Sequence, residues 1–270
     1  PDVGDIYVNR LLTNLSIGYR NQRFIADQIF PIVPVDERSG IYAAYNQSPW
    51  FRDEAKLRAP GTEAAESGWT VDNTNTFFCL NYAIRKAIPD EVRLAAQQPY
   101  DMDRDATLWV TEMMQIRRER AFAADFMKIS TWGTDQTISN KWSDYGASDP
   151  ISDLRTAART IRQKTGFRAN SLVLGELVWH RLQDHPDFLD RIKFTQTALM
   201  TTELLARVLE LERVLVGSAM FTSDFEGVAE ASVSYTDIFN DDALMLYVAD
   251  RPSLMTPSAG YTFVWRPLTG

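Results

Sequence analysis

The sequence predicts an α+β fold with one long helix in its first half and alternating helices and strands in its second half. The first observation is a helical pattern of apolar residues from Asp101 to Ile129. The second is a long polar stretch, Asn46 to Ser67, between two strand-like segments. The third is a change after Pro150, where helical and strand patterns alternate.

The first 78 residues are predicted to form an extended arm and then a long loop. Residues 1–39 form the arm, because Pro31 and Pro34 exclude a regular central strand from its apolar run. Residues 40–78 form a two-stranded loop with a charged outer end. A loop of this length is uncommon inside a compact domain and indicates either a function or disorder.

The outer end of this loop is predicted to contact other protein subunits. The candidate contact residues combine two large aromatic side chains with basic ones: Trp50, Phe51, Arg52, Lys56 and Arg58. Exposed aromatic groups are a liability for an isolated monomer, and Trp and Arg are enriched in interfaces. The alternative is a disordered loop end.

The long helix is predicted to run from Asp101 to Ile129, which is about 40 Å at 1.5 Å per residue. No Pro or Gly interrupts it before Gly133, and either Asp101 or Asp103 can cap its start. The Gly-, Ser- and Asp-rich segment from Trp132 to Asp149 predicts a loop and the expected domain boundary.

The second half of the chain is predicted to alternate helices and strands and to end in short strands. The predicted helices are Ile151–Lys164, Glu176–Gln183 and Thr202–Leu209. The predicted strands are Ser171–Leu174, Arg213–Val216, Ser232–Tyr235, Ala243–Ala249 and Tyr261–Trp265. This order is typical of a mixed α/β domain.

The composition indicates an ordinary globular protein. With 270 residues, of which 45% are hydrophobic, the chain can bury a core in one or two domains. The formal net charge of -8 argues against a surface that grips nucleic acid through its phosphates. Cys79 is the single cysteine, and no signal-like or membrane-spanning apolar run occurs, so we expect folding in a cytoplasm.

No residues form a convincing catalytic, cofactor or metal site. His180 and His185 are five residues apart, which places them on different faces of a helix and predicts structural roles. The chain has no glycine-rich phosphate loop and no Gly-x-Ser-x-Gly motif. Acid pairs such as Asp241–Asp242 are typical of solvated turns, so a hydrolase has only scattered acids in its favour.

A basic cluster on the long helix allows two interpretations. Arg117, Arg118 and Arg120 lie close to Glu119 and Asp125, so a solvated helix face with ion pairs along the helix is the favoured one. The alternative is contact with another subunit or with enclosed DNA.

Several short strings, taken in order, carry a resemblance to a known family. They are Phe24–Pro31, Trp142–Tyr145, Ser148–Ile151, Asn170–Gly175, Val178–Trp179, His185–Pro186, Arg191–Gln196, Arg213–Gly217 and Pro257–Phe263. Together with the order of arm, loop, long helix and mixed half, they resemble the major capsid proteins of tailed double-stranded-DNA bacteriophages, which have the Hong Kong 97 capsid fold. The resemblance covers nearly the whole chain.

The resemblance implies a domain scheme. Residues 1–39 would be the N-terminal arm, 40–78 the extended loop, 79–149 the peripheral domain with its spine helix, 150–249 the axial domain, and 250–270 a return toward the peripheral domain. The chain ends at Gly270, soon after Trp265, so either the last segment is short or C-terminal residues are missing.

The resemblance also implies a function and partners. The chain would assemble as hexamers and pentamers into an icosahedral head that encloses DNA without sequence-specific binding. Its partners would be other copies, with scaffold, portal and possibly decoration proteins, and it would need no cofactor, metal or membrane. Some relatives cross-link this loop through a lysine and an asparagine; Lys56 is the only lysine at the outer end of this loop, and no asparagine is matched to it. An encapsulin shell, which encloses cargo enzymes, is the alternative.

Overall fold

The computed structural model describes residues 21, 23–95, 101–192, 200–253 and 255–266. Most of the predicted arm, residues 1–20, therefore lies outside the described residues. The chain divides into two compact units. Unit 1 comprises Pro1–Ile29, Tyr82–Ala158 and Asn170–Leu246, and unit 2 comprises Phe30–Asn81, Arg159–Ala169 and Tyr247–Gly270.

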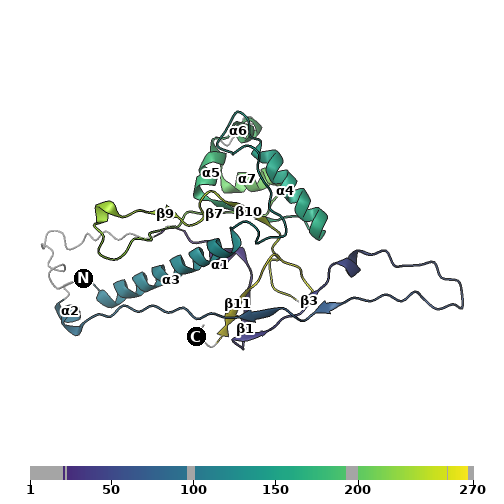
Figure 1. The fold of residues 1–270 in the computed structure, drawn as a ribbon, viewed down its shortest axis with the longest axis horizontal. Coiled ribbons are helices and arrows are strands. Elements are labelled where there is room, and N and C mark those ends of the chain that lie inside the picture. The colour runs from purple at the N-terminus through teal and green to yellow at the C-terminus, as the bar shows by residue number, and fades with distance from the viewer. Residues whose placement is uncertain (1–20, 22, 96–100, 193–199, 254, 267–270) are drawn as a thin grey trace. The chain divides into compact units, whose positions relative to one another are not determined.

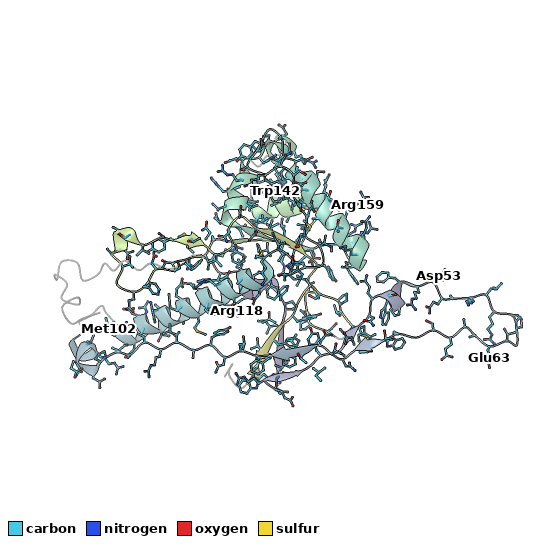
Figure 2. All side chains as sticks on the ribbon, viewed as in Figure 1. Asp53, Glu63, Met102, Arg118, Trp142 and Arg159 are labelled. Atoms are coloured by element: carbon cyan, nitrogen blue, oxygen red, sulfur yellow. The ribbon has the colours of Figure 1, made fainter. Side chains whose placement is uncertain are left out.

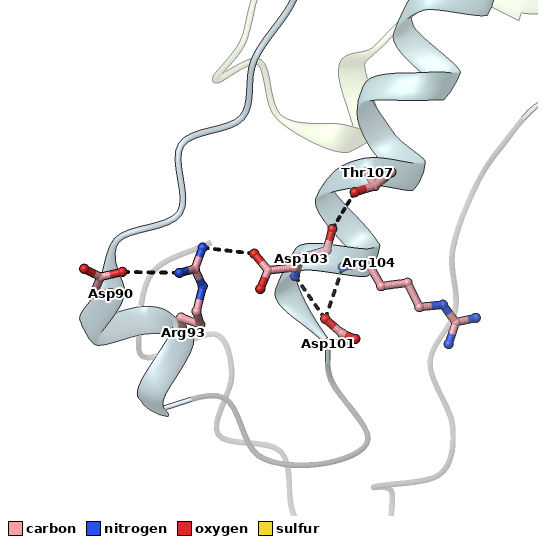
Figure 3. Close-up of polar contacts among 6 residues, drawn as sticks. All are labelled: Asp90, Arg93, Asp101, Asp103, Arg104 and Thr107. Atoms are coloured by element: carbon pink, nitrogen blue, oxygen red, sulfur yellow. Dashed lines mark hydrogen bonds and ion pairs between the residues drawn. The ribbon is translucent and has the colours of Figure 1, made fainter. Parts of the chain in front are cut away.

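Helix α3, Met102–Phe126, is the long helix predicted from the sequence, and Figure 1 shows it as one continuous rod. Asp101 caps it, because its Oδ1 accepts hydrogen bonds from the backbone N–H groups of Asp103 and Arg104, each at 3.1 Å. Figure 3 shows these bonds, together with Arg93 of α2, Asp90–Ala95, which pairs with Asp103 at 3.0 Å. The predicted start of the helix is confirmed.

The predicted end of the long helix at Ile129 is wrong, because α3 ends three residues earlier, at Phe126. The indole Nε1 of Trp132 donates to the carbonyl of Phe126 at 2.7 Å, and the hydroxyl of Thr131 donates to the carbonyl of Asp125 at 3.0 Å. Side chains from the following loop thus satisfy carbonyl groups that another helical turn would have used. Ser130 has a left-handed backbone, with φ of 67°, which stops the helix from continuing.

Unit 1 contains a three-stranded mixed sheet in the order β10–β6–β7. Strand β6, Ser171–Gly175, lies in the centre, parallel to β7, Arg213–Gly217, and antiparallel to β10, Ala243–Leu246. Every residue of β6 is buried, as expected of a central strand. A side chain on Gly217 would overlap the buried ring of Phe239, since a Cβ there would lie 2.3 Å from the ring. The close packing of this ring therefore requires glycine.

Three of the four helices of the second half follow the predictions closely, and the fourth, α6, was not predicted. The four are α4, Pro150–Thr165; α5, Glu176–Gln183; α6, Pro186–Ile192; and α7, Thr202–Leu209. The predicted bounds of α5 and α7 are confirmed at both ends. At α7 the hydroxyl of Thr201 accepts from the N–H of Leu204, and Glu210 takes the left-handed conformation at the other end.

A short hairpin of β8, Met220–Phe221, and β9, Thr236–Asp237, replaces the predicted strand at Ser232–Tyr235. That prediction is wrong, because the segment ends a 3₁₀ turn, η4, Glu230–Ser232. The carboxylate of Asp224 accepts the N–H of Ser234 at 2.6 Å. This side-chain bond occupies a donor that a strand ladder would have used.

Unit 2 contains three two-stranded ladders. Strand β1, Ile32–Val35, runs parallel to β11, Thr262–Trp265. This sheet has two strands and so no central one, which agrees with the prediction that the prolines exclude a central strand. The loop pairs β2, Ser39–Ile41, with β5, Thr76–Phe78, and β3, Ala44–Tyr45, with β4, Val71–Asp72. The predicted two-stranded loop is therefore confirmed as a local structure.

Candidate subunit-contact surface

The long loop of unit 2 extends well beyond its paired strands. Residues 46–70 contain no strand, and the chain reverses where the N–H of Thr62 donates to the carbonyl of Ala59 at 3.2 Å. Gly61 has φ of 83° in this turn, a conformation that glycine adopts without strain. In Figure 2, Asp53 lies on the outgoing side of the loop and Glu63 lies near its outer end.

The loop exposes an unusual number of large apolar side chains. They lie on or beside the paired strands, on the 3₁₀ turn η3, Ser48–Phe51, in the outer part of the loop, and in the segment that follows β5. The exposed residues are Ile41, Tyr42, Tyr45, Trp50, Phe51, Leu57, Trp69, Val71, Phe78 and Leu80. An apolar surface of this kind is typical of protein interfaces.

Two of the predicted contact residues do not lie at the outer end of the loop. Trp50 and Phe51 belong to η3, beside β3 and β4, so their predicted position is wrong. The ring of Trp50 lies 6.0 Å from that of Trp69, and the antiparallel pairing brings these two rings together. The ring of Phe51 packs on Gly166, where a Cβ would lie 2.5 Å from it. Trp50 nevertheless remains 52% exposed.

The basic candidates divide into two groups. Arg52 stays at η3, where it bonds to Glu54 and to the hydroxyl of Ser48, both at 3.3 Å. Such exposed pairs contribute little to stability. Lys56 and Arg58 lie farther out, and within the described residues neither has an ion pair. The structure thus places Trp50 in η3 and Arg52 directly after it, with Lys56 and Arg58 farther along the loop.

The arm root, which we define as Asn21 and residues 23–29, is a second feature of interest, and sequence reasoning missed it. Its helix α1, Ala26–Ile29, is a single turn held at its start by Glu119 of α3. One carboxylate oxygen, Oε1, accepts the N–H groups of Ile25 and Ala26, each at 2.6 Å. Glu119 is 1% exposed, and burial raises the pKa of its carboxyl above the ordinary value, with these hydrogen bonds acting in the opposite direction.

The other end of α1 is held by Arg213 of β7. Its guanidinium donates to the carbonyls of Gln28 at 2.7 Å and Ile29 at 2.9 Å, and also to the hydroxyl of Ser171 at 2.8 Å. Charged side chains from two distant elements therefore hold a four-residue helix at both of its ends. The partners are more than 90 residues apart in the sequence, so no local pattern could have indicated them.

The basic cluster of α3 makes tertiary contacts, so the prediction of ion pairs along the helix is wrong. Arg118 forms an ion pair with Asp27 of the arm root. The guanidinium of Arg117 lies 4.7 Å from the ring centre of Tyr82, and that of Arg120 lies 4.2 Å from the ring centre of Phe221. Glu119, expected as a helical partner, instead accepts bonds from the arm root.

His185 superficially resembles part of a hydrolytic site. Its Nε2 lies 3.0 Å from the hydroxyl of Ser148, and Asp187 lies on the other side of the ring. However, Nδ1 accepts the backbone N–H of Asp187 at 3.3 Å, so in the neutral ring Nε2 is the donor. The hydroxyl of Ser148 then donates to the carbonyl of Asp144, at 2.6 Å. This buried ring cannot remove the proton of Ser148, and the arrangement is a structural network.

The remaining acids do not assemble into a reactive site. Burial and the neighbouring Asp241 raise the pKa of Asp242, but the pair sits at the start of β10. Among the described residues no group of three or more His, Cys, Asp or Glu side chains could hold a metal ion. A search of the same residues finds no helix long and apolar enough to cross a membrane.

The comparisons with known proteins agree with the resemblance stated above. No protein-family model matches the chain. It is 27% identical over 267 residues to the major capsid protein of Burkholderia phage BcepMu, an alignment that covers 94% of this chain and 82% of that protein. The chain is similar to phage major capsid proteins. A second capsid relative, from Pseudomonas phage JBD67, is 26% identical over 216 residues and covers 77% of this chain and 67% of that protein.

The solved structures point in the same direction. A crystal structure of a phage-related protein from Bordetella bronchiseptica has a TM-score of 0.66 and 25% identity, and covers 96% of this chain and 84% of that one. These capsid and phage relatives favour a phage head protein over an encapsulin shell. The α+β fold class is confirmed.

Proposed function

We propose that this chain is the major subunit of a phage head and that it has the Hong Kong 97 capsid fold. Many copies assemble as hexamers and pentamers into an icosahedral shell around double-stranded DNA. The observation that carries this proposal is the similarity to a phage major capsid protein over 94% of this chain and 82% of the relative. The protein acts as a structural component of the virion and not as an enzyme.

In this proposal the domains are those expected from the sequence. Residues 1–39 act as the arm, 40–78 as the extended loop, 79–149 as the peripheral domain, 150–249 as the axial domain and 250–270 as the returning segment. The long helix α3 supports the assignment of the peripheral domain, and the mixed sheet β10–β6–β7 supports that of the axial domain.

The loop joins neighbouring subunits in this proposal. Its exposed aromatic surface, with Trp50, Phe51 and Trp69, lies against another copy, while Lys56 and Arg58 contact acidic groups farther along it. Burial of one such aromatic side chain contributes about 1.5–3 kcal/mol, so several together can hold two subunits. Arg52 supports η3 from within the loop.

The remaining partners follow from the role of a shell. We propose that scaffold, portal and possibly decoration proteins bind the assembling copies in the host cytoplasm. The net charge of -8 fits a container that encloses DNA without holding it tightly, because like charges keep the phosphates away.

Electron microscopy of the purified chain, with and without residues Asp53–Arg58, tests the proposal. We expect closed particles from the intact chain and a folded subunit without stable shells from the deletion. The matched control replaces the same six residues by glycine and serine, which keeps the length and removes the side chains. Normal particles from the deletion would contradict the proposed contacts of Lys56 and Arg58. A stable 30.7 kDa monomer, or particles filled with a cargo enzyme, would contradict the head function.

A further inference from the structure

Helix α4 exposes three arginines on one face. Arg155, Arg159 and Arg162, which we call the arginine row, are separated by four and three residues and are all exposed. Positions with this spacing lie one above the other on a helix, so the row is about 10 Å long at 1.5 Å per residue. The boundary between the two units falls within α4, but the helix is continuous and fixes the spacing by itself. Figure 2 labels Arg159 in the row.

The arginine row has no partner within the described part of the chain, since none of its members has an ion pair, hydrogen bond or ring contact there. The acids at the start of α4 are engaged elsewhere. Asp149 accepts the N–H of Ser152 at 2.9 Å, and Asp153 accepts the indole N–H of Trp142 at 2.9 Å. Three like charges at this spacing repel one another, so an external anionic partner would stabilise them.

A surface with complementary chemistry lies at the hairpin tip, Thr222–Ser232, between β8 and β9. Phe225 is 88% exposed there, and the neighbouring Glu226 is also exposed. Side-chain bonds hold the tip in shape, because Asp224 accepts the N–H of Ser234 at 2.6 Å and the hydroxyl of Tyr235 donates to Glu230 at 3.0 Å. A preformed loop that presents one aromatic ring and one carboxylate loses little entropy on binding.

We propose that the arginine row binds the hairpin tip of a second copy of this chain. Glu226 pairs with a guanidinium, and the ring of Phe225 stacks on another, two interactions that arginine makes well. The net charge of -8 favours a protein partner over DNA, because the chain as a whole repels phosphates. A contact between two different surfaces of identical subunits is head-to-tail and can close a ring. This inference rests on the proposed shell function.

A charge exchange in the full-length chain tests the contact. Arg159→Glu and Glu226→Arg are each made alone and then together, and the assembled fraction is measured by sedimentation and electron microscopy. We expect each single reversal to lower this fraction about tenfold, because like charges then face each other, and the double variant to recover it to within about twofold. Circular dichroism of each variant checks that the subunit is folded, and Arg159→Ala tests the row without introducing a negative charge. Arg85→Glu, at an exposed arginine outside any helix, is the matched control and should assemble normally.

Each other outcome overturns the contact. Normal assembly of Arg159→Glu would show that the row is not an interface, and loss of assembly without recovery in the double variant would show that its partner is not Glu226. Normal particles with a reduced DNA content would assign the row to nucleic acid instead. If the intact chain forms no particles, both the head function and this contact fail, whereas failure of the exchange in a chain that does assemble removes only the contact.

Discussion

The arginines of α3 and those of α4 differ in where their partners lie, although both sets occupy exposed or half-exposed positions on helices. Arg118 pairs with Asp27, and Arg120 lies over the ring of Phe221, so α3 uses its basic groups within unit 1. The arginine row of α4 has no comparable contact among the described residues. The arginines of α3 therefore stabilise their own subunit, while those of α4 are available to a second molecule.

The two sets of arginines predict different effects of substitution. A charged group used within the subunit should affect the free energy of unfolding, and a charged group kept for another subunit should affect assembly alone. Four measurements on the unassembled subunit and on particles test this distinction.

The largest effect on stability should follow Glu119→Ala. The change leaves the buried N–H groups of Ile25 and Ala26 without an acceptor, and we expect a loss of about 3 kcal/mol in the free energy of unfolding. Urea denaturation of the unassembled subunit measures it. Glu112→Ala is the matched control on the same helix, since it removes the single bond to the N–H of Asn21 and should cost about 1 kcal/mol. Equal effects of the two substitutions would contradict the special role of Glu119.

A smaller loss should follow Arg213→Ala. The carbonyls of Gln28 and Ile29 lose their donor, and we expect a loss of about 2 kcal/mol by the same measurement. Arg213→Lys keeps the charge but cannot donate to these carbonyls and to Ser171 together, so it should recover only part of the stability. Full recovery by lysine would mean that charge alone matters at this end of α1.

The sequence predicted the elements with local signals and missed the contacts that join distant ones. The start of α3 follows from its capping residue, Asp101, and both ends of α5 and α7 follow from the local sequence pattern. The bonds of Glu119 and Arg213 to the arm root link residues 93 to 185 positions apart, and no local pattern encodes them.

The candidate contact surface was predicted in part for the same reason. The aromatic composition of the loop indicated an interface, but the position of Trp50 depends on the pairing of β3 with β4, which brings Trp69 beside it. The strand expected at Ser232–Tyr235 does not form, because the carboxylate of Asp224 accepts the hydrogen bond of the Ser234 N–H. In both places tertiary or side-chain contacts overrode the local preference.

A modest pH effect should distinguish Glu119 from the exposed charges. Burial raises its pKa in the folded subunit, so the folded state binds the proton more tightly than the unfolded state does. The stability that this proton provides is fully present below the ordinary value of 4.5 and is lost as the pH rises through the raised pKa. The free energy of unfolding of the wild type, relative to Glu119→Gln, should therefore fall as the pH rises above 4.5. If the free energy of unfolding of the wild type instead rose with pH relative to Glu119→Gln, the folded subunit would favour the ionised carboxylate of Glu119.

The smallest effect on subunit stability should come from the arginine row. Arg155→Ala, Arg159→Ala and Arg162→Ala each remove a side chain without a described partner, so we expect changes below about 0.5 kcal/mol in the free energy of unfolding. Assembly should nevertheless decline with each substitution, because a contact to a second copy is lost. Arg118→Ala, which breaks the pair with Asp27, should show the reverse order, with a measurable loss of stability. A larger loss of stability from a substitution in the arginine row than from Arg118→Ala would contradict this distinction. It would mean that the row contacts its own chain.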